Sequence, residues 1–220
     1  QRDIARQLLG PGVGAVIARL RGPMELLKPD MRLIVLDLCM PAIQQLSRPQ
    51  YTAFREALTQ VIRADGHVSL FEWTMRSVLA RRVEARFGAL VERPGNATLQ
   101  ARQRDAWTLL SAMAWAGGAD RAQRALARGL DQLQLPVQDP APAAQCTLDA
   151  VDAALERLAQ LREADRHRMV EGAAATVSED GLLKPQELLL LRAVADRLNV
   201  LIPSAVELLE QDAPGALLDP

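Results

Sequence analysis

A short phrase that occurs twice constrains this chain more than any other feature of its sequence. Residues 64–72 read Ala-Asp-Gly-His-Val-Ser-Leu-Phe-Glu, and residues 179–187 read Glu-Asp-Gly-Leu-Leu-Lys-Pro-Gln-Glu. Each copy has Asp-Gly, one further residue, an aliphatic residue and, four positions later, a Glu. Each copy also lies between two segments with helical apolar periodicity. The repeat therefore predicts a fold with internal pseudo-two-fold symmetry, built from two units of helix, Asp-Gly turn and helix.

The composition favours an all-α, multi-helix bundle. Hydrophobic residues make up 49% of the 220 residues and aromatic residues only 3%, so the apolar share is dominated by aliphatic residues, above all the strong helix formers Leu and Ala. The net charge of −1 gives no electrostatic reason to expect nucleic-acid binding. The longest apolar run, residues 33–42, is interrupted by Asp37 and Pro41 and is far too short to span a membrane.

Gly and Pro residues divide the chain into expected elements. We expect residues 1–29 to form short helical pieces, broken at Gly22-Pro23 among other sites, and Pro41 to kink or break the helix that Asp30 would cap. A cap at Ser47 or Arg48 should start the next helix. Further helices are expected over about 51–63, 71–79, 99–115, 120–133, 147–161, 170–177 and 191–198, with a cap residue at Thr147 and a C-terminal cap at Asn199.

The expected organisation is an N-terminal helical extension followed by one helical domain. Residues 1–48 would form the extension, packed on the core, and residues 49–210 the domain. A loop rich in Pro and Ala at about 134–146 would interrupt the domain, and residues 211–220 would be a flexible tail. Because the chain begins with Gln1 and shows no signal peptide, we expect it to be a soluble part of a longer protein.

The repeated phrase has a purely structural interpretation. Asp-Gly favours a tight turn, because Gly66 and Gly181 can adopt a positive φ angle. In the first copy Ser69 and Glu72 fit a capping box. In the second copy Pro185 fits the first helical position, which again makes the Glu the third helical residue. The acids would then act as turn and cap residues.

The alternative interpretation is a site for a divalent cation. Gly, an aliphatic residue two positions later and a Glu four positions after that match the second half of a calcium-binding EF-hand loop. The first half does not match, since Val61 and Arg63, or Thr176 and Ser178, stand where acidic or amide ligands are needed. The two copies together could still supply one shared site, whose candidate ligands are Asp65, Glu72, Asp180 and Glu187.

At these residues the chain resembles the TerB-like family of tellurite-resistance type. Its members are helical domains in which two such Asp-Gly…Glu segments occupy corresponding helix corners, and the resemblance covers about residues 49–203. It implies a link to stress response and metal binding.

Residues 31–51, together with both repeated phrases, are also similar to the region that follows the protease domain in bacterial HtpX-like zinc metallopeptidases. That second resemblance implies a membrane-associated parent protein, with the side of the membrane left open.

No catalytic site is predicted. A zinc peptidase needs His-Glu-x-x-His on a helix, and neither His67 nor His167 stands in that pattern. We expect His67 to lie in a solvated loop, His167 with Asp165 and its arginine neighbours on a solvated helix face, and Cys39 to be a buried structural thiol. Trp73, Trp107 and Trp115 are expected to be core anchors or interface residues.

The expected function is that of a non-catalytic helical interaction or regulatory module. Its partner would be another protein or the parent protease domain, with no cofactor of its own and no nucleic acid or membrane span. The alternative is a stress-response domain that binds a divalent cation through the paired phrases. The sequence leaves the identity of the partner and the oligomeric state open.

Overall fold

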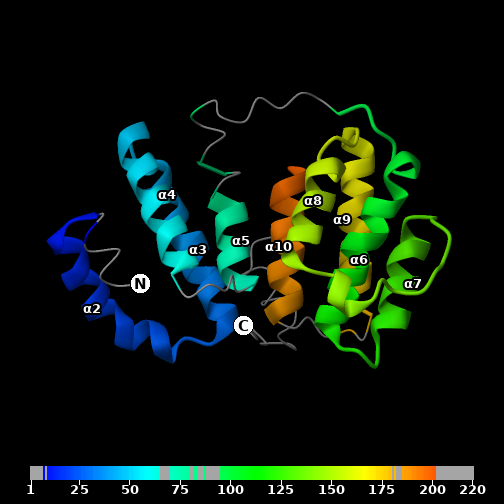
Figure 1. The fold of residues 1–220 in the computed structure, drawn as a ribbon, viewed down its shortest axis with the longest axis horizontal. Coiled ribbons are helices and arrows are strands. Elements are labelled where there is room, and N and C mark those ends of the chain that lie inside the picture. The colour runs from blue at the N-terminus through cyan, green and yellow to red at the C-terminus, as the bar shows by residue number, and fades with distance from the viewer. Residues whose placement is uncertain are drawn as a thin grey trace, which may run out of the picture. The chain divides into compact units, whose positions relative to one another are not determined.

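A computed structural model shows an all-α protein, as the composition predicts (Figure 1). In the part of the chain that the structure describes, the only pairing of β type is a single parallel bridge between Ala97 and Leu161. The structure describes residues 7, 9–64, 70–79, 82–83, 87, 95–179, 181 and 185–201.

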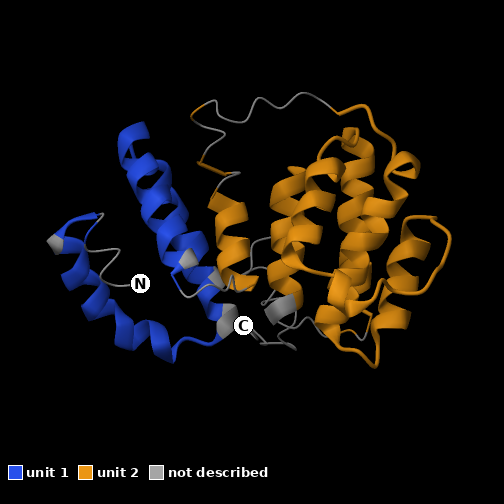
Figure 2. Cartoon of the chain, viewed as in Figure 1, with its two compact units in different colours: residues 1–68, 202–220 blue, residues 69–201 orange. Residues whose placement is uncertain are grey.

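The chain divides into two compact units (Figure 2). The first consists of residues 1–68 and 202–220, and the second of residues 69–201. The expected extension over 1–48 and domain over 49–210 stay predictions, as does the tail at 211–220, which lies outside the described residues.

The first unit contains helices α2 (Pro11–Leu26), α3 (Pro29–Gln44) and α4 (Arg48–Arg63). The expected break at Gly22-Pro23 is wrong, because α2 runs through Pro23 without interruption. Proline removes one helical hydrogen bond and leaves the carbonyl four residues earlier, that of Arg19, without its donor. This part of α2 is exposed, so water can replace the missing N–H.

Helix α3 differs from the expectations for Asp30, Pro41 and Cys39. Lys28, not Asp30, is its N-cap residue, because Pro29 already occupies the first helical position. Pro41 lies inside the continuous helix, so it does not break α3, and the expected kink there stays a prediction. Leu36 and Met40 form its buried face. Cys39 is exposed rather than buried, because it lies beside that face and not on it. The predicted cap of α4 is confirmed: the backbone N–H of Ser47 donates to Gln50 Oε1 over 2.9 Å in a capping box.

The second unit contains α5 (Leu70–Leu79), α6 (Gln103–Gly117), α7 (Ala122–Gln132), α8 (Leu148–Leu158), α9 (Glu163–Val177) and α10 (Pro185–Leu198). Helix α6 packs against α7, α8, α9 and α10, and α10 also packs against α5, α8 and α9. These contacts bury α10 on almost every side, including the predicted apolar positions Leu191, Val194, Ala195 and Leu198.

Predicted caps in the second unit are confirmed. Thr147 Oγ1 accepts a hydrogen bond from the N–H of Ala150 at the start of α8. Asn199 ends α10 with a φ of 55°, and the N–H of Val200 then reaches back to the carbonyl of Ala195. Asparagine tolerates this left-handed conformation better than most side chains.

The predicted loop at 134–146 lies along α6. It is irregular except for one short 3₁₀ turn at Ala143–Gln145. The indole N–H of Trp107 donates to the carbonyl of Asp139, and that of Trp115 donates to the carbonyl of Ala141. Between these two tryptophans on the same face of α6, Ser111 Oγ accepts a hydrogen bond from the N–H of Ala141. Trp107 and Trp115 therefore fasten the loop, whereas Trp73 is a buried core residue.

Candidate functional site

The structure describes half of the residues that the repeated phrase predicts as a site. Asp65, Gly66, Ser69 and Asp180 lie outside the described residues, as does His67. Of the others, Gly181 has a φ of 75°, as a glycine turn requires, and Pro185 is the first residue of α10. Glu72 and Glu187 lie in the first turns of α5 and α10, at the third helical position that was predicted for each.

Glu187 is buried beside the C-terminal end of α6. Its side chain is 3% exposed, and a Cβ atom added to Gly117 would lie 2.5 Å from its Oε1. The guanidinium of Arg121 donates to the carbonyl of the same glycine through Nη2. Glycine at position 117 is therefore what leaves room for this carboxylate. Glu187 does not stand at an open surface where a hydrated metal ion would enter.

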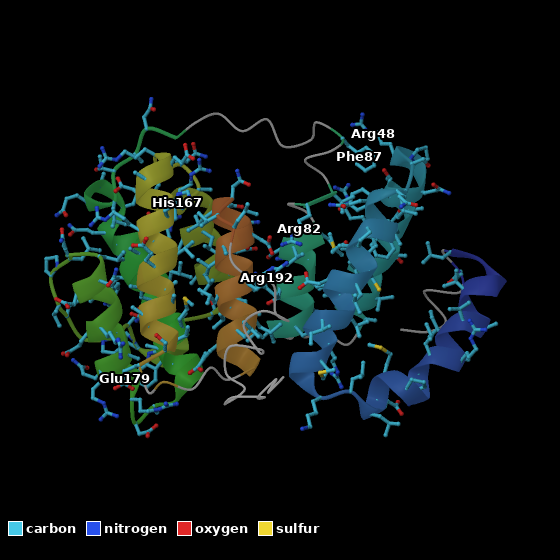
Figure 3. The ribbon with its side chains drawn as sticks, turned by 180° about the vertical axis from the view of Figure 1, so that it is seen from behind. Arg48, Arg82, Phe87, His167, Glu179 and Arg192 are labelled. Atoms are coloured by element: carbon cyan, nitrogen blue, oxygen red, sulfur yellow. The ribbon has the colours of Figure 1, made fainter. Side chains whose placement is uncertain are left out.

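Two arginines of α7 contact Glu179, the first residue of the second phrase. Arg124 Nε lies 3.0 Å from Glu179 Oε1, and Arg128 Nη1 donates to the carbonyl of Glu179 over 3.3 Å. Figure 3 shows Glu179 at the end of α9, beside α7. A positive charge on a neighbouring helix thus already neutralises the acid that precedes Asp180.

The helices that follow the two phrases pack against each other. Thr74 Oγ1 on α5 donates to the carbonyl of Leu189 on α10 over 3.3 Å. Beyond the end of α5, Arg82 Nε donates to Asp196 of α10 over 3.0 Å, and Asp196 also accepts from Arg192 Nε at 2.8 Å. Helices α5 and α10 therefore run in the same direction along their contact.

Arg76 and Arg82 are each paired with an acid of the same unit. Arg76 Nη2 lies 2.9 Å from Asp152 on α8, which also lies 3.5 Å from Arg197 on α10. The contacts of Arg76 tie α5 to α8, and the Arg82–Asp196 pair adds a contact to α10.

A network around Asp165 was not foreseen. This residue was expected on a solvated helix face, but it is 1% exposed. Its Oδ2 accepts from the N–H of Leu99 at 3.1 Å and from Arg162 Nε at 2.7 Å, and its Oδ1 accepts from Arg168 Nη1 at 3.2 Å. Burial acts to raise the pKa of Asp165, but these hydrogen bonds outweigh it and the pKa lies below its ordinary value. The sequence did contain a signal for this network, because Asp165 has an arginine three positions before it and another three positions after it.

His167 conforms to the expectation of an exposed side chain on α9 (Figure 3), with Nδ1 3.0 Å from the carbonyl of Glu163. Cys146 is half-buried, and desolvation raises the pKa of its thiol.

Among the residues that the structure describes, no three His, Cys, Asp or Glu side chains gather as metal ligands would. None of the described helices has the length and apolar character needed to cross a membrane.

The surface of α2 is the second feature that the sequence did not reveal. Val16, Leu20 and Met24 are 44%, 48% and 36% exposed, and their spacing of four residues places them along one side of the helix. Leu26 and Leu38 of the same unit are 86% and 73% exposed. The stripe was missed because a break was expected at Gly22-Pro23, which would have separated Met24 from Leu20.

Comparisons with protein-family models, with curated proteins and with solved structures gave no match. The TerB-like and HtpX-like resemblances therefore rest on the residues quoted above.

Proposed function

We propose that this chain is a non-catalytic helical interaction module of TerB-like type, from the C-terminal part of a membrane-associated bacterial metallopeptidase, and that α2 is its docking helix. The observation that carries the proposal is the exposed stripe of Val16, Leu20 and Met24. An apolar stripe along an exposed helix is the usual means by which one helical protein contacts another.

The distribution of exposed apolar residues supports the same assignment. In the described part of the second unit, Val137 and Leu201 are the large apolar side chains that are strongly exposed. The remaining ones lie between Val16 and Leu38 in the first unit. Apolar exposure concentrated on one unit favours a contact surface over random surface composition.

The TerB-like type, with its internal repeat, is supported by the register of α5 against α10. Glu187 follows Glu72 by 115 positions, and the hydrogen bond from Thr74 to Leu189 joins residues with the same separation. Equivalent positions of two copies meet in this way when a pseudo-two-fold axis runs between the two helices.

Site-specific crosslinking tests the docking helix. A photoreactive amino acid at Leu20 in the natural full-length protein should crosslink to the peptidase domain, because the stripe would be covered there. The control is the same group at Gln132, which is exposed on α7 of the other unit. Mass spectrometry then maps the crosslinked peptide.

Equal crosslinking from Leu20 and Gln132 would contradict the proposal that α2 is a docking helix. A crosslink only to a second copy of α2 would show that the partner of α2 is another copy of this chain and not the peptidase domain. A natural gene without a His-Glu-x-x-His segment upstream would overturn the parent assignment.

The divalent-cation alternative stays a prediction, because two of its four candidate ligands lie outside the described residues. Calorimetric titration with calcium, magnesium, manganese and zinc should give heat that an Asp65→Ala/Asp180→Ala variant lacks, if the paired phrases bind a cation. The burial of Glu187 and the pairing of Glu179 with arginines favour the opposite result. No heat and an unchanged melting temperature would exclude the alternative.

A further inference from the structure

A small polar pocket lies over the Asp165 network, within the second unit. Its volume is about 210 Å³, and the side chains that matter for its chemistry are Thr98, Gln100, Gln134, Arg162, Asp165 and Arg168. Three segments form it: the chain before α6, the end of α7 and the first turns of α9. The bridge between Ala97 and Leu161 holds the first of these segments against the start of α9.

The two arginines of the pocket have different tasks. Arg168 uses Nη1 for Asp165 and Nη2 for the carbonyl of Leu133, 2.8 Å away, so it connects α9 to the end of α7. Arg162 uses only Nε, which donates to Asp165. Within the described part of the chain, no group bonds to its Nη1 or Nη2, and its side chain is 58% exposed.

The bond to Asp165 fixes the orientation of the Arg162 guanidinium. A buried carboxylate that holds one edge of an arginine leaves the opposite edge, Nη1 with Nη2, preorganised for a ligand. That edge is a planar pair of donors, which matches the two oxygens of a carboxylate. With one acid and two arginines, the pocket carries a single net positive charge, which suits a ligand group of charge −1.

The rest of the pocket is neutral and polar. The amides of Gln100 and Gln134 are exposed at its edge and can both donate and accept hydrogen bonds. Gln134 has a φ of 56°, the left-handed conformation, as the α7 helix ends. A volume of about 210 Å³ is below the 300–1,000 Å³ that is typical of sites for drug-sized ligands, so only a group of a few atoms fits.

The geometry points to a binding site for a monocarboxylate, held end-on by Arg162 Nη1 and Nη2, with an adjoining amide or hydroxyl group of the ligand between Gln100 and Gln134. The carboxylate can come from a free small acid or from the C-terminus of a peptide. Both sources offer the same group to the same arginine edge.

Nuclear magnetic resonance titration of the full chain tests the site. The probes are N-acetylglycine, acetyl-triglycine with a free C-terminus, the same peptide with an amidated C-terminus, and inorganic phosphate. We expect backbone amide shifts at Thr98, Gln134 and Arg162, with a Kd on the order of 1 mM for a ligand this small. The amidated peptide should bind at least tenfold more weakly than the free one.

Three variants test whether Arg162 binds the carboxylate. Arg162→Gln should weaken N-acetylglycine binding at least tenfold. Gln100→Glu, which leaves every bond to Asp165 in place, should do the same by charge repulsion. Arg124→Gln, which removes an arginine ion-paired to Glu179 outside the pocket, should change the affinity less than twofold. Because Gln100→Glu does not touch the network, it remains informative if Arg162→Gln fails to fold.

Each outcome has a defined meaning. Equal affinity for N-acetylglycine and the free peptide assigns a small free acid, and peptide binding that is tenfold tighter assigns a chain terminus; both support the site. The proposal is overturned by the absence of carboxylate binding, by binding that neither pocket variant weakens, or by phosphate binding tighter than carboxylate. These outcomes do not depend on the docking role of α2.

Discussion

At the scale of single residues, the two buried carboxylates of Asp165 and Glu187 have structural tasks, although the sequence pattern predicts a solvated position for Asp165. Asp165 joins the chain before α6 to the first turns of α9, and through Arg168 to the end of α7. Glu187 occupies the space that the missing side chain of Gly117 leaves. A carboxylate is stable in such places only when charged or N–H donors surround it.

Removal of the Asp165 charge should lower stability in a pH-dependent manner. Because its native pKa lies below the ordinary 3.8, the unfolded chain binds the proton more readily than the native one. The stabilisation is therefore complete above about pH 5 and is lost as the pH falls through the native pKa. Asp165→Asn should cost about 2 kcal/mol at pH 7, and the difference from the natural chain should shrink at pH 3.

Urea denaturation at both pH values measures this difference. Asp131→Asn, at an exposed site on α7, is the matched control and should change the free energy of unfolding by less than about 0.5 kcal/mol. A cost for Asp165→Asn that stays the same at pH 3 would show that geometry, and not charge, explains the role of Asp165.

At the scale of elements, the close approach of α7 and α9 depends on glycines. Helices α7 and α9 cross where Gly129 faces Thr176 and Gly172. A Cβ atom on Gly129 would overlap Thr176 Oγ1 and would lie 2.9 Å from the carbonyl oxygen of Gly172. The two backbones therefore meet more closely than any larger residue allows.

Gly129→Ala should destabilise the protein by about 1–3 kcal/mol, because overpacking outweighs the better helix propensity of Ala. The double variant Gly129→Ala/Thr176→Ala should recover part of this loss, since it removes the closest atom. Gly22→Ala in α2 is the control, because nothing lies within 4 Å of the added Cβ. Thermal unfolding measures all three variants, and a Gly129→Ala protein as stable as the natural chain would contradict the close crossing.

At the scale of the whole molecule, the two units differ in how they bury their side chains. In the second unit, α6 and α10 are covered by several neighbours, and Leu109, Leu110 and Leu198 are fully buried. In the first unit, α2 is mostly exposed. Local stability follows the number of buried contacts, so it should differ between the units.

Hydrogen exchange measured by mass spectrometry should show this difference. We expect the amides of α6 and α10 to exchange slowest, because opening them exposes the core. The amides of α2 should exchange faster by at least about 100-fold, since a helix with little packing opens at low cost. Peptides from α8 and α9, in the same unit as α6, serve as an internal reference. Equal protection of α2 and α6 would contradict this order.

Much of the local structure was predictable, because caps and turns depend on a few adjacent residues. The sequence by itself determined the all-α class, the caps at Ser47 and Thr147, the left-handed end at Asn199 and the turn glycine at 181. It also placed Glu72 and Glu187 at the third position of their helices. These features require no knowledge of which helices meet.

Only the tertiary structure decided which side chains are buried and by what. Helix α2 continues through Pro23 because this part of the helix is exposed to water. The exposure of Cys39 is determined by which face of α3 is buried. The burial of Asp165 and the pocket above it require three segments that are far apart in the chain. Solvent exposure and the pairing of charges are properties of the packed helices, and for that reason the candidate sites appear only after folding.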